Sequence, residues 1–350
     1  MTAAAKLQRL RIAKLPDTPL LASDTFELVE DAMPVPAEGE AVLRMVYHSV
    51  DAGTRESLSP DSDYVVKRKV GEAPFGSSAV GEVIASRHAD FPVGSLAVTS
   101  LSDYQSHVLV RPGTTRGLRR IEHGLPLSAH AGILGLTGFT AWCGVFRAFP
   151  LRPGECFVVS AAAGAVGAAA GQFARIAGAR TVGIAGGPEK CDFLVRELGF
   201  DAAVDYRKDL AAGLASACPE GIDFFFDNVG GEVLRSAFAH MNPLGRIAIS
   251  GQLAQYGNSS AAAGPNMMTA VLKRLSIRGF LSVQDWPELM PRFLDEVSTW
   301  LRDGRIANPV TIVEGLANAH EAINNLMTGR NIGKQLLQVG PEPVPVEQTE

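Results

Sequence analysis

The strongest chemical signal is a glycine-containing turn between an apolar strand and a helix. A strand is expected over 155–160 and a helix from about Val166, and Ala162, Gly164 and Gly167 between them form A-x-G-x-x-G. Glycines let the backbone approach a pyrophosphate, whose charge faces the free N–H groups of the helix N-terminus. The pattern could also serve only to pack an Ala/Gly-rich helix on a sheet. Its place inside a βαβ unit favours nucleotide binding.

The end of the next strand indicates which nucleotide binds. Proteins that prefer NAD carry an acidic residue there, which holds the ribose 2′-hydroxyl. This strand instead ends in Ala-Gly-Gly at Gly187, so no carboxylate repels a 2′-phosphate. Lys190 follows one helical turn later and could pair with that phosphate, and Tyr206 could flank it. Each residue alone could be an ordinary surface side chain, but the missing acid together with Lys190 favours NADP(H).

Another polar signal follows the strand that contains three consecutive phenylalanines. The stretch 227–231 (DNVGG) begins where this strand ends. Ligands of doubly wound sheets bind at the carboxyl ends of the strands. Asn228 could therefore hydrogen-bond the ribose of a nicotinamide, or it could be a turn residue that caps the next helix.

The elements that must position these residues alternate between strand and helix from about residue 130 onward. Such alternation predicts a parallel sheet that is covered by helices on both faces. The expected strands are 155–160, 180–184, 203–205, 224–227, 246–250 and 277–280, and the expected helices are 166–177, 188–198 and 232–240.

The first 130 residues indicate a different kind of domain. Short apolar runs at 41–51, 79–87 and 94–100 are bounded by glycine, proline or aspartate, and few helical repeats appear. This pattern predicts an antiparallel, barrel-like β domain. A strand, a helix and a strand over 311–339 could return to it, so the two domains need not be consecutive.

Composition excludes several classes of protein. The net charge of −5 over 350 residues argues against a surface built for nucleic acid, which needs basic patches. The four cysteines show no metal-ligand spacing and are expected to be reduced thiols of a cytoplasmic protein. No apolar stretch reaches the length that a membrane span requires, and no signal-peptide core is visible, so neither secretion nor membrane insertion is expected.

Taken together, these motifs resemble those of a known family. The sequence is similar to the zinc-independent medium-chain dehydrogenases/reductases, in the branch of leukotriene B4 12-hydroxydehydrogenases, prostaglandin reductases and alkenal double-bond reductases. The likeness covers nearly the whole chain and is most specific between 130 and 256. The matching stretches are GLTGFTAW (135–142), AAAGAVG (161–167), AGGPEKC (185–191), LGFDAAVDY (198–206), FDNVGG (226–231), GRIAISGQLAQY (245–256) and GRNIGKQLLQV (329–339).

The resemblance implies an α/β fold with two domains. A GroES-like β-barrel domain that binds substrate would comprise 1–129 and 311–345, around a Rossmann NADP-binding domain with a doubly wound parallel sheet over 130–310. The Pro- and Glu-rich residues 346–350 would be a disordered tail. The family also implies NADP(H) as cofactor, a small unsaturated carbonyl compound as substrate, and a homodimer.

The same resemblance implies a set of cofactor-binding residues. Gly164, Ala165, Val166 and Gly167 would hold the pyrophosphate, and Gly187, Lys190 and Tyr206 would surround the 2′-phosphate end. The ribose and nicotinamide end would be lined by Asn228, Ser250, Gly251, Tyr256, Phe280, Leu281, Ser282 and Asn331.

Zinc chemistry is not expected, although zinc-dependent relatives share the fold. Those relatives carry a Cys and a Gly-His-Glu element for the metal. Here Gly71-Glu72 lacks the His, and all cysteines lie beyond residue 142. His48 and His107 are better interpreted as packing or strand residues than as ligands.

The expected reaction is therefore hydride transfer without a metal, from NADPH to the β-carbon of an α,β-unsaturated ketone or aldehyde. Charge then builds on the carbonyl oxygen, which needs a hydrogen-bond donor. A tyrosine at the motif position of Tyr256 is implicated in the resembling reductases, although it could merely cover the cofactor. Tyr47 is a weaker candidate, because its alternating strand indicates a core aromatic. Alternatives are a quinone reductase, a specialised biosynthetic reductase of C=C or C=N bonds, or a non-enzymatic NADPH-binding protein.

The chain departs from the family at two places in the β domain. The usual Asp-Pro-x-Met-Arg-like element is replaced over 51–55 by DAGTR, in which Asp51 and Arg55 could form a structural ion pair. The second departure is SDYQ at 102–105, where Gly-Trp-Gln is common. Small residues at 52–54 predict a roomier or more mobile substrate pocket.

Overall fold

A computed structural model describes residues 6–59, 65–121, 124–256 and 263–343. The chain divides into two compact units. Unit 1 consists of Met1–Gly135, Val310–Arg330 and Gln335–Glu350, and unit 2 of Leu136–Pro309 and Asn331–Lys334. The segment Asn331–Lys334 thus lies in unit 2, although we expected 311–345 as a whole to complete the first domain. The expected tail at 346–350 lies outside the described residues.

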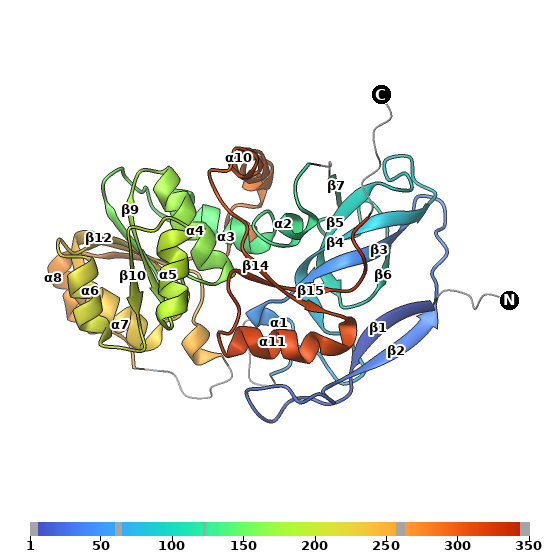
Figure 1. The fold of residues 1–350 in the computed structure, drawn as a ribbon, viewed down its shortest axis with the longest axis horizontal. Coiled ribbons are helices and arrows are strands. Elements are labelled where there is room, and N and C mark those ends of the chain that lie inside the picture. The colour runs from blue at the N-terminus through green and yellow to red at the C-terminus, as the bar shows by residue number, and fades with distance from the viewer. Residues whose placement is uncertain (1–5, 60–64, 122–123, 257–262, 344–350) are drawn as a thin grey trace. The chain divides into compact units, whose positions relative to one another are not determined.

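Unit 2 contains a six-stranded parallel sheet in the order β10-β9-β8-β11-β12-β13 (Figure 1). Counted from β8 along the chain, this is the strand order 3-2-1-4-5-6 of a Rossmann fold. The order in which the strands are added reverses between β8 and β11, which is the topological switch point. The fold class that we expected for this part of the chain is confirmed. The strands are β8 (Cys156–Val159), β9 (Arg180–Ala185), β10 (Ala202–Asp205), β11 (Ile222–Asp227), β12 (Met241–Ile249) and β13 (Ser276–Gly279).

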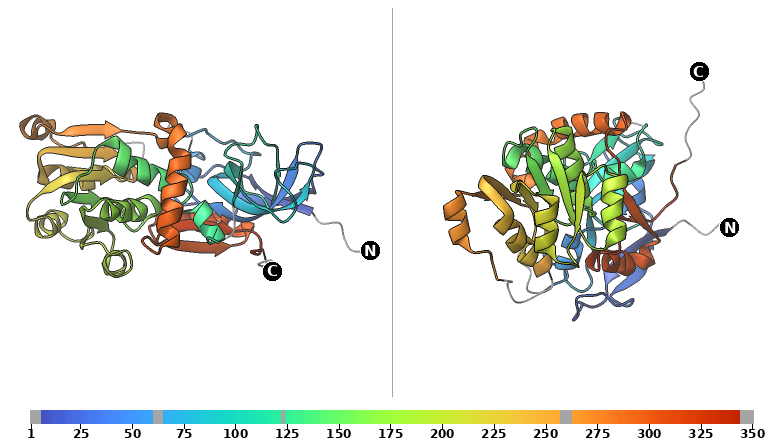
Figure 2. Two further views of the ribbon diagram at one scale, coloured as in Figure 1. Left: turned by 90° about the horizontal axis from the view of Figure 1, so that it is seen from above. Right: turned by 60° about the vertical axis from the view of Figure 1, so that its left-hand side comes forward.

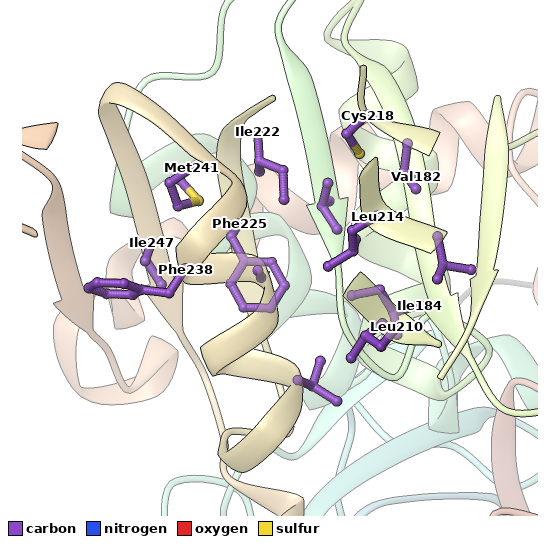
Figure 3. Packing of buried hydrophobic residues seen from close by; sticks show 14 residues of the cluster. Val182, Ile184, Leu210, Leu214, Cys218, Ile222, Phe225, Phe238, Met241 and Ile247 are labelled. Carbon is purple, nitrogen blue, oxygen red and sulfur yellow. The ribbon is translucent and has the colours of Figure 1, made fainter. Parts of the chain in front are cut away.

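Helices cover both faces of this sheet, because alternate strand residues point to opposite faces. On one face, Val158, Val182 and Phe225 contact side chains of α6 (Leu210–Ala217) and α7 (Gly231–His240) in a buried apolar cluster, as Figure 3 shows. The helices α4 (Ala165–Ile176) and α5 (Pro188–Arg196) contact the strands as well. Figure 2 shows the same layers from two further directions.

Several helices of unit 2 were not predicted. Helix α6 reads LAAGLASA, which has little contrast between polar and apolar positions, so its periodicity is weak. The Asp209 side chain starts it by accepting a hydrogen bond from the Ala212 N–H at 3.0 Å. The other unpredicted helices are α3 (Leu136–Cys143), α8 (Met267–Lys273), α9 (Ser282–Asp285) and α10 (Met290–Arg302), with a π-helical turn over Gly144–Ala148.

Unit 1 is built on a second sheet of seven strands, in which β3 pairs antiparallel with β4, β6 and β15. The C-terminal strand β15 therefore lies beside a strand from the N-terminal part of the chain. A separate antiparallel ribbon joins β1 and β2. The elements are β1 (Lys6–Ile12), β2 (Phe26–Ala32), β3 (Ala41–Ser49), β4 (Phe75–Ser86), β5 (Leu96–Asp103), β6 (His107–Val110), β7 (Arg119–Ile121), β14 (Val310–Glu314), β15 (Lys334–Gln338), α1 (Ala52–Glu56), α2 (Leu127–Ala131) and α11 (Ala319–Met327).

No helix in the described part of the chain is long and apolar enough to cross a membrane.

His48 is part of the core of unit 1, in line with its interpretation as a packing residue. Its side chain is fully buried on β3, Nε2 lies 2.9 Å from the Gln105 carbonyl oxygen, and its ring meets that of Tyr104 edge-on. Burial lowers the pKa of His48 from 6.5 to about 4.

This pKa shift predicts a pH dependence of stability. Between pH 6.5 and 4 the unfolded chain binds a proton at His48 that the folded chain does not, so the free energy of unfolding should fall as the pH falls. Relative to His48→Gln, which keeps a donor for Gln105, the wild-type chain should lose on the order of 3 kcal/mol more between pH 7 and 4. Urea titrations at several pH values measure this difference, and parallel curves for the two proteins would contradict it.

Candidate functional site

The predicted glycine turn joins β8 to α4 and brings two backbone segments into direct contact. The Gly164 N–H donates to the Ala161 carbonyl at 2.9 Å, and Ala161 adopts a positive φ of 49°. A Cβ on Gly167 would lie only 2.3 Å from the Ala161 oxygen, so only glycine fits there. Gly164 is the N-cap of α4 and has no side chain to occupy the N–H groups of the first turn, at Ala165 and Val166. These N–H groups can therefore receive an anion.

The segment Asn331–Lys334 runs beside this turn. The Gly333 N–H donates to the Ala163 carbonyl at 2.7 Å, and Gly333 forms a parallel bridge with Gly164. The buried side chain of Asn331 donates to the Gly333 carbonyl at 2.9 Å. The resemblance implied that Asn331 lines the ribose and nicotinamide end; in the structure its side chain binds Gly333, which in turn bridges to the glycine turn.

The second part of the site lies where β9 and β10 end. Gly187, with φ of 90°, caps α5, and its N–H donates to Asp205 Oδ1 at 2.8 Å. The same oxygen accepts the Arg207 N–H at 3.1 Å, and these backbone hydrogen bonds lower the pKa of Asp205. A Cβ on Gly186 would lie 2.9 Å from the Tyr206 ring. Glycine at this position thus leaves room for the half-exposed ring close to the backbone.

Two cationic side chains meet at this corner. Burial lowers the pKa of Lys190, and the Arg207 guanidinium lowers it further. Arg207 Nη1 also lies 3.3 Å from the position of a Cβ on Gly187. The sequence analysis predicted Lys190 but missed Arg207, which could have been noticed as the basic residue directly after Tyr206. The corner is suited to a doubly charged anion.

Asn228 is held in a buried polar network at the topological switch point. Its Nδ2 donates to the Ser160 carbonyl at 2.8 Å, and its Oδ1 accepts the Ser250 hydroxyl at 2.6 Å. Helix α7 is capped by Gly230, so the alternative interpretation of Asn228 as that helix's cap is wrong. Ser160, which the sequence analysis did not single out, contributes its carbonyl and hydroxyl oxygens to this network.

Asp227 fixes the start of the loop that follows β11. Its carboxylate accepts the Ser160 hydroxyl at 2.9 Å and the N–H groups of Val229 and Gly230 at about 3 Å. Burial raises the pKa of Asp227, and these donors counteract the rise.

The predicted loop from Ser250 to Tyr256 folds back onto the same switch point. The Leu253 N–H donates to the Asn228 carbonyl at 3.1 Å, and Leu253–Gln255 form a short 3₁₀ turn. The Tyr256 hydroxyl lies 3.6 Å from the position of a Cβ on Gly251. The structure therefore brings Tyr256, Gly251 and Asn228 together.

The three residues predicted after β13 differ in character. Phe280 is a core residue whose ring meets Phe226 edge-on at 6.0 Å. Leu281 is exposed, and the buried Ser282 hydroxyl lies 2.9 Å from that of Thr140. The Phe280 N–H donates to the Ile249 carbonyl at 3.3 Å, which joins this segment to the end of β12.

Asp51 and Arg55, the two residues of the stretch 51–55 that fit the family element, have structural partners. Asp51 accepts the Ser49 hydroxyl at 2.6 Å and the Ser77 N–H at 2.8 Å. Arg55, in the short helix α1, donates to the carbonyl oxygens of Thr18 and Pro19. Tyr47 is buried in the sheet core, as expected for a core aromatic. The prediction of a roomier pocket at 52–54 is not tested by these contacts.

Metal ligands are a separate question, because dehydrogenases of this fold include zinc enzymes. Among the described residues there is no group of three or more His, Cys, Asp or Glu side chains that could hold a metal ion. A zinc site needs three or four such ligands around one point. The described residues therefore do not fit zinc.

The fold and the site together define the class of protein. The chain belongs to the zinc-independent medium-chain dehydrogenases/reductases, as the resemblance implied. The family model described as zinc-binding dehydrogenase matches residues 165–297, and the model described as the N-terminal domain of oxidoreductase matches residues 8–118.

Three of the relatives make the comparison concrete. The NADPH-dependent curcumin reductase of Escherichia coli is 34% identical over 90% of this chain and 92% of its own. The NADP(+)-dependent 2-alkenal reductase of Nicotiana tabacum is 35% identical over 87% of this chain and 88% of its own. The crystal structure of CurA from Vibrio vulnificus in complex with NADPH superposes with a TM-score of 0.86 at 33% identity, covering 96% of this chain and all of that one.

Proposed function

We propose that this protein is an NADPH-dependent reductase of the C=C bond in α,β-unsaturated ketones and aldehydes. The proposal is carried by the agreement between the similarity to known reductases and the geometry of the site. The chain is similar over nearly its whole length to NADPH-dependent reductases, and its own residues form a nucleotide cradle at the switch point of the sheet. Steady-state oxidation of NADPH against a panel of enones, alkenals and quinones tests it.

Each part of the cradle has a role in holding the cofactor. The turn from Gly164 to Gly167 receives the pyrophosphate, because its backbone presents first-turn N–H groups of α4 without a side chain in front. Lys190 and Arg207 receive the 2′-phosphate, beside the ring of Tyr206. The network of Asn228 and Ser250 orients the ribose that carries the nicotinamide.

The proposed reaction uses the hydride of the cofactor and the hydroxyl group of Tyr256. Bound NADPH supplies a hydride from its nicotinamide ring to the β-carbon of the substrate. Tyr256 donates a hydrogen bond to the carbonyl oxygen, on which negative charge builds. The α-carbon then receives a proton from water or from Tyr256. No metal is needed, since the hydroxyl group stabilises the enolate.

Other functions for the same site remain alternatives. A quinone reductase would favour quinones in the panel, and a specialised biosynthetic reductase would act on other C=C or C=N bonds. A non-enzymatic NADPH-binding protein would bind NADPH tightly and turn over nothing in the panel. The sequence similarity to alkenal and curcumin reductases favours the enone reductase.

The protein is also proposed to act in the cytoplasm as a homodimer, with unit 1 as the substrate domain. Strand β13 is an edge strand in the described part of unit 2, and its four residues are exposed. The preceding helix α8 exposes Met267, Met268, Val271 and Leu272, each by more than half. A second copy of this chain could pair with β13 across a two-fold axis and cover these side chains.

The first prediction from the proposed function concerns the 2′-phosphate. Lys190→Ala should weaken NADPH binding roughly 10- to 100-fold, because a charge-assisted hydrogen bond to the phosphate is lost. NADH lacks that phosphate, so its dissociation constant should change little. Arg207→Ala should show the same selectivity. Titration calorimetry measures both cofactors, with Lys14→Ala, an exposed residue of unit 1, as control. Equal losses for NADPH and NADH would remove either residue from this role.

The second prediction concerns Tyr256. Tyr256→Phe should lower kcat about 100-fold while leaving the dissociation constant of NADPH nearly unchanged, because the hydroxyl acts on charge that forms during the reaction. Tyr47→Phe, which removes a hydroxyl from the core of unit 1, is the matched control. Unchanged turnover in Tyr256→Phe would leave this residue as a cover for the cofactor.

The third prediction concerns the dimer. The wild-type protein should elute with the mass of two chains in light scattering coupled to size exclusion. Replacing Leu272 and Ile277 by lysine should yield a folded monomer, because both side chains are exposed in the single chain. A monomeric wild-type protein, or a dimer that survives the double substitution, would contradict this interface.

A further inference from the structure

Two thiols meet at the end of the parallel sheet that the cofactor does not use. Cys156 is the first residue of β8, whereas the glycine turn follows the last residue of that strand. Cys218 ends α6 as its C-cap and is 3% exposed. Figure 3 shows Cys218 beside Val182 and Ile222, at the opposite end of the apolar cluster from Leu210. Cys156 is half-buried against the same cluster, and the two side chains are in hydrogen-bond contact.

The surroundings of the two thiols are unequal. Arg180 Nη1 lies 3.9 Å from Cys156 Sγ and stands directly across from it in the register of β8 and β9. The Cys218 thiol donates a hydrogen bond to Cys156, which lowers the pKa of Cys156, and the Arg180 charge lowers it further. The same hydrogen bond, together with burial, raises the pKa of Cys218. Burial opposes the lowering at Cys156, but of the two thiols Cys156 is the one whose thiolate is favoured, and Cys218 is the one kept protonated.

The backbone at Cys156 is firmly held. Its N–H donates to the Asp223 carboxylate at 2.8 Å, and the Arg180 N–H donates to the Glu155 carbonyl at 2.9 Å. The thiol of Cys156 is thus presented to Cys218 by a fixed strand, not by a loose loop.

We propose that Cys156 and Cys218 form a peroxide-reactive modification site that closes to a disulfide. The Cys156 thiolate attacks one oxygen of hydrogen peroxide, the O–O bond breaks, and Cys156 becomes a sulfenic acid with release of hydroxide. The Cys218 thiol gives its proton to that hydroxide and attacks Cys156 Sγ. The S–O bond breaks and the second oxygen leaves as water once it is protonated by the solvent. In total, two thiols and one peroxide yield one disulfide and two waters.

The disulfide would close a loop that contains β8, α4, β9, α5, β10 and α6. Closing a loop of this length restricts the unfolded chain and should stabilise unit 2. Because both sulfurs lie at the amino ends of the strands, NADPH binding at the carboxyl ends should persist. The proposal is independent of the enzyme's substrate.

The experiment treats the reduced full-length protein with hydrogen peroxide and follows intact mass and non-reducing peptide maps. Wild-type protein should lose the mass of two hydrogen atoms and yield a peptide that links Cys156 to Cys218, reversed by dithiothreitol. Its midpoint of thermal unfolding should rise on oxidation and return on reduction. Cys218→Ser should instead trap a dimedone-reactive sulfenic acid at Cys156. Cys191→Ser, which removes a half-buried thiol elsewhere in unit 2, should behave like wild type.

A second measurement keeps the proposal testable if a cysteine variant fails to fold. In wild-type protein, peptide-resolved labelling with iodoacetamide at neutral pH should modify Cys156 about tenfold faster than Cys191, whose pKa is raised by burial. The proposal is overturned if peroxide adds oxygen without linking 156 to 218, if Cys191 reacts first, or if the disulfide lowers the unfolding midpoint.

Discussion

The contact between Gly167 and the Ala161 carbonyl is the constraint on which the rest of the site depends. A Cβ at residue 167 would lie 2.3 Å from that oxygen, so the first turn of α4 can sit this close to the strand end only with glycine. The turn so formed offers each neighbour one hydrogen bond. Ser160 binds β11 through Phe226, Ala162 binds β9 through Ile184, and Ala163 binds the segment 331–334. Three segments distant in sequence are thereby aligned on one turn.

The charged side chains near Gly187 have two separate roles. The Asp205 carboxylate accepts backbone N–H groups, which fix the turn at Gly187 and lower its pKa, and the charges of Lys208 and Arg207 lower that pKa further. Burial lowers the pKa of Lys190, and repulsion by the Arg207 guanidinium lowers it further. A 2′-phosphate would relieve this repulsion, whereas a 2′-hydroxyl would not. A protein with a negative net charge can thus still favour a doubly charged anion at one local site.

The sequence predicted those parts of the site that rest on local rules. The strand, turn and helix around Gly164 follow from glycine spacing, and Lys190 and Tyr206 follow from their position after strand ends. Arg207 was missed although it directly follows Tyr206, and Ser160 was missed because its role arises only when β8 and β11 lie side by side. Asn331 was reached by resemblance alone, since it binds Gly333, whose partner Gly164 lies more than 160 residues away in the sequence. Helix α6 was missed because its alanine-rich sequence shows little amphipathic contrast.

The two ends of β8 serve different chemistry because the strand is short and rigidly paired. Its carboxyl end leads into the glycine turn, and its amino end carries Cys156. The ion pair between Glu155 and Arg246, with both side chains largely buried, links the amino end of β8 to β12 across the intervening strand β11. The backbone around Cys156 is therefore already fixed by neighbouring strands when its thiol is oxidised. The glycine turn and the thiol pair therefore lie at opposite ends of one strand that is fixed along its length.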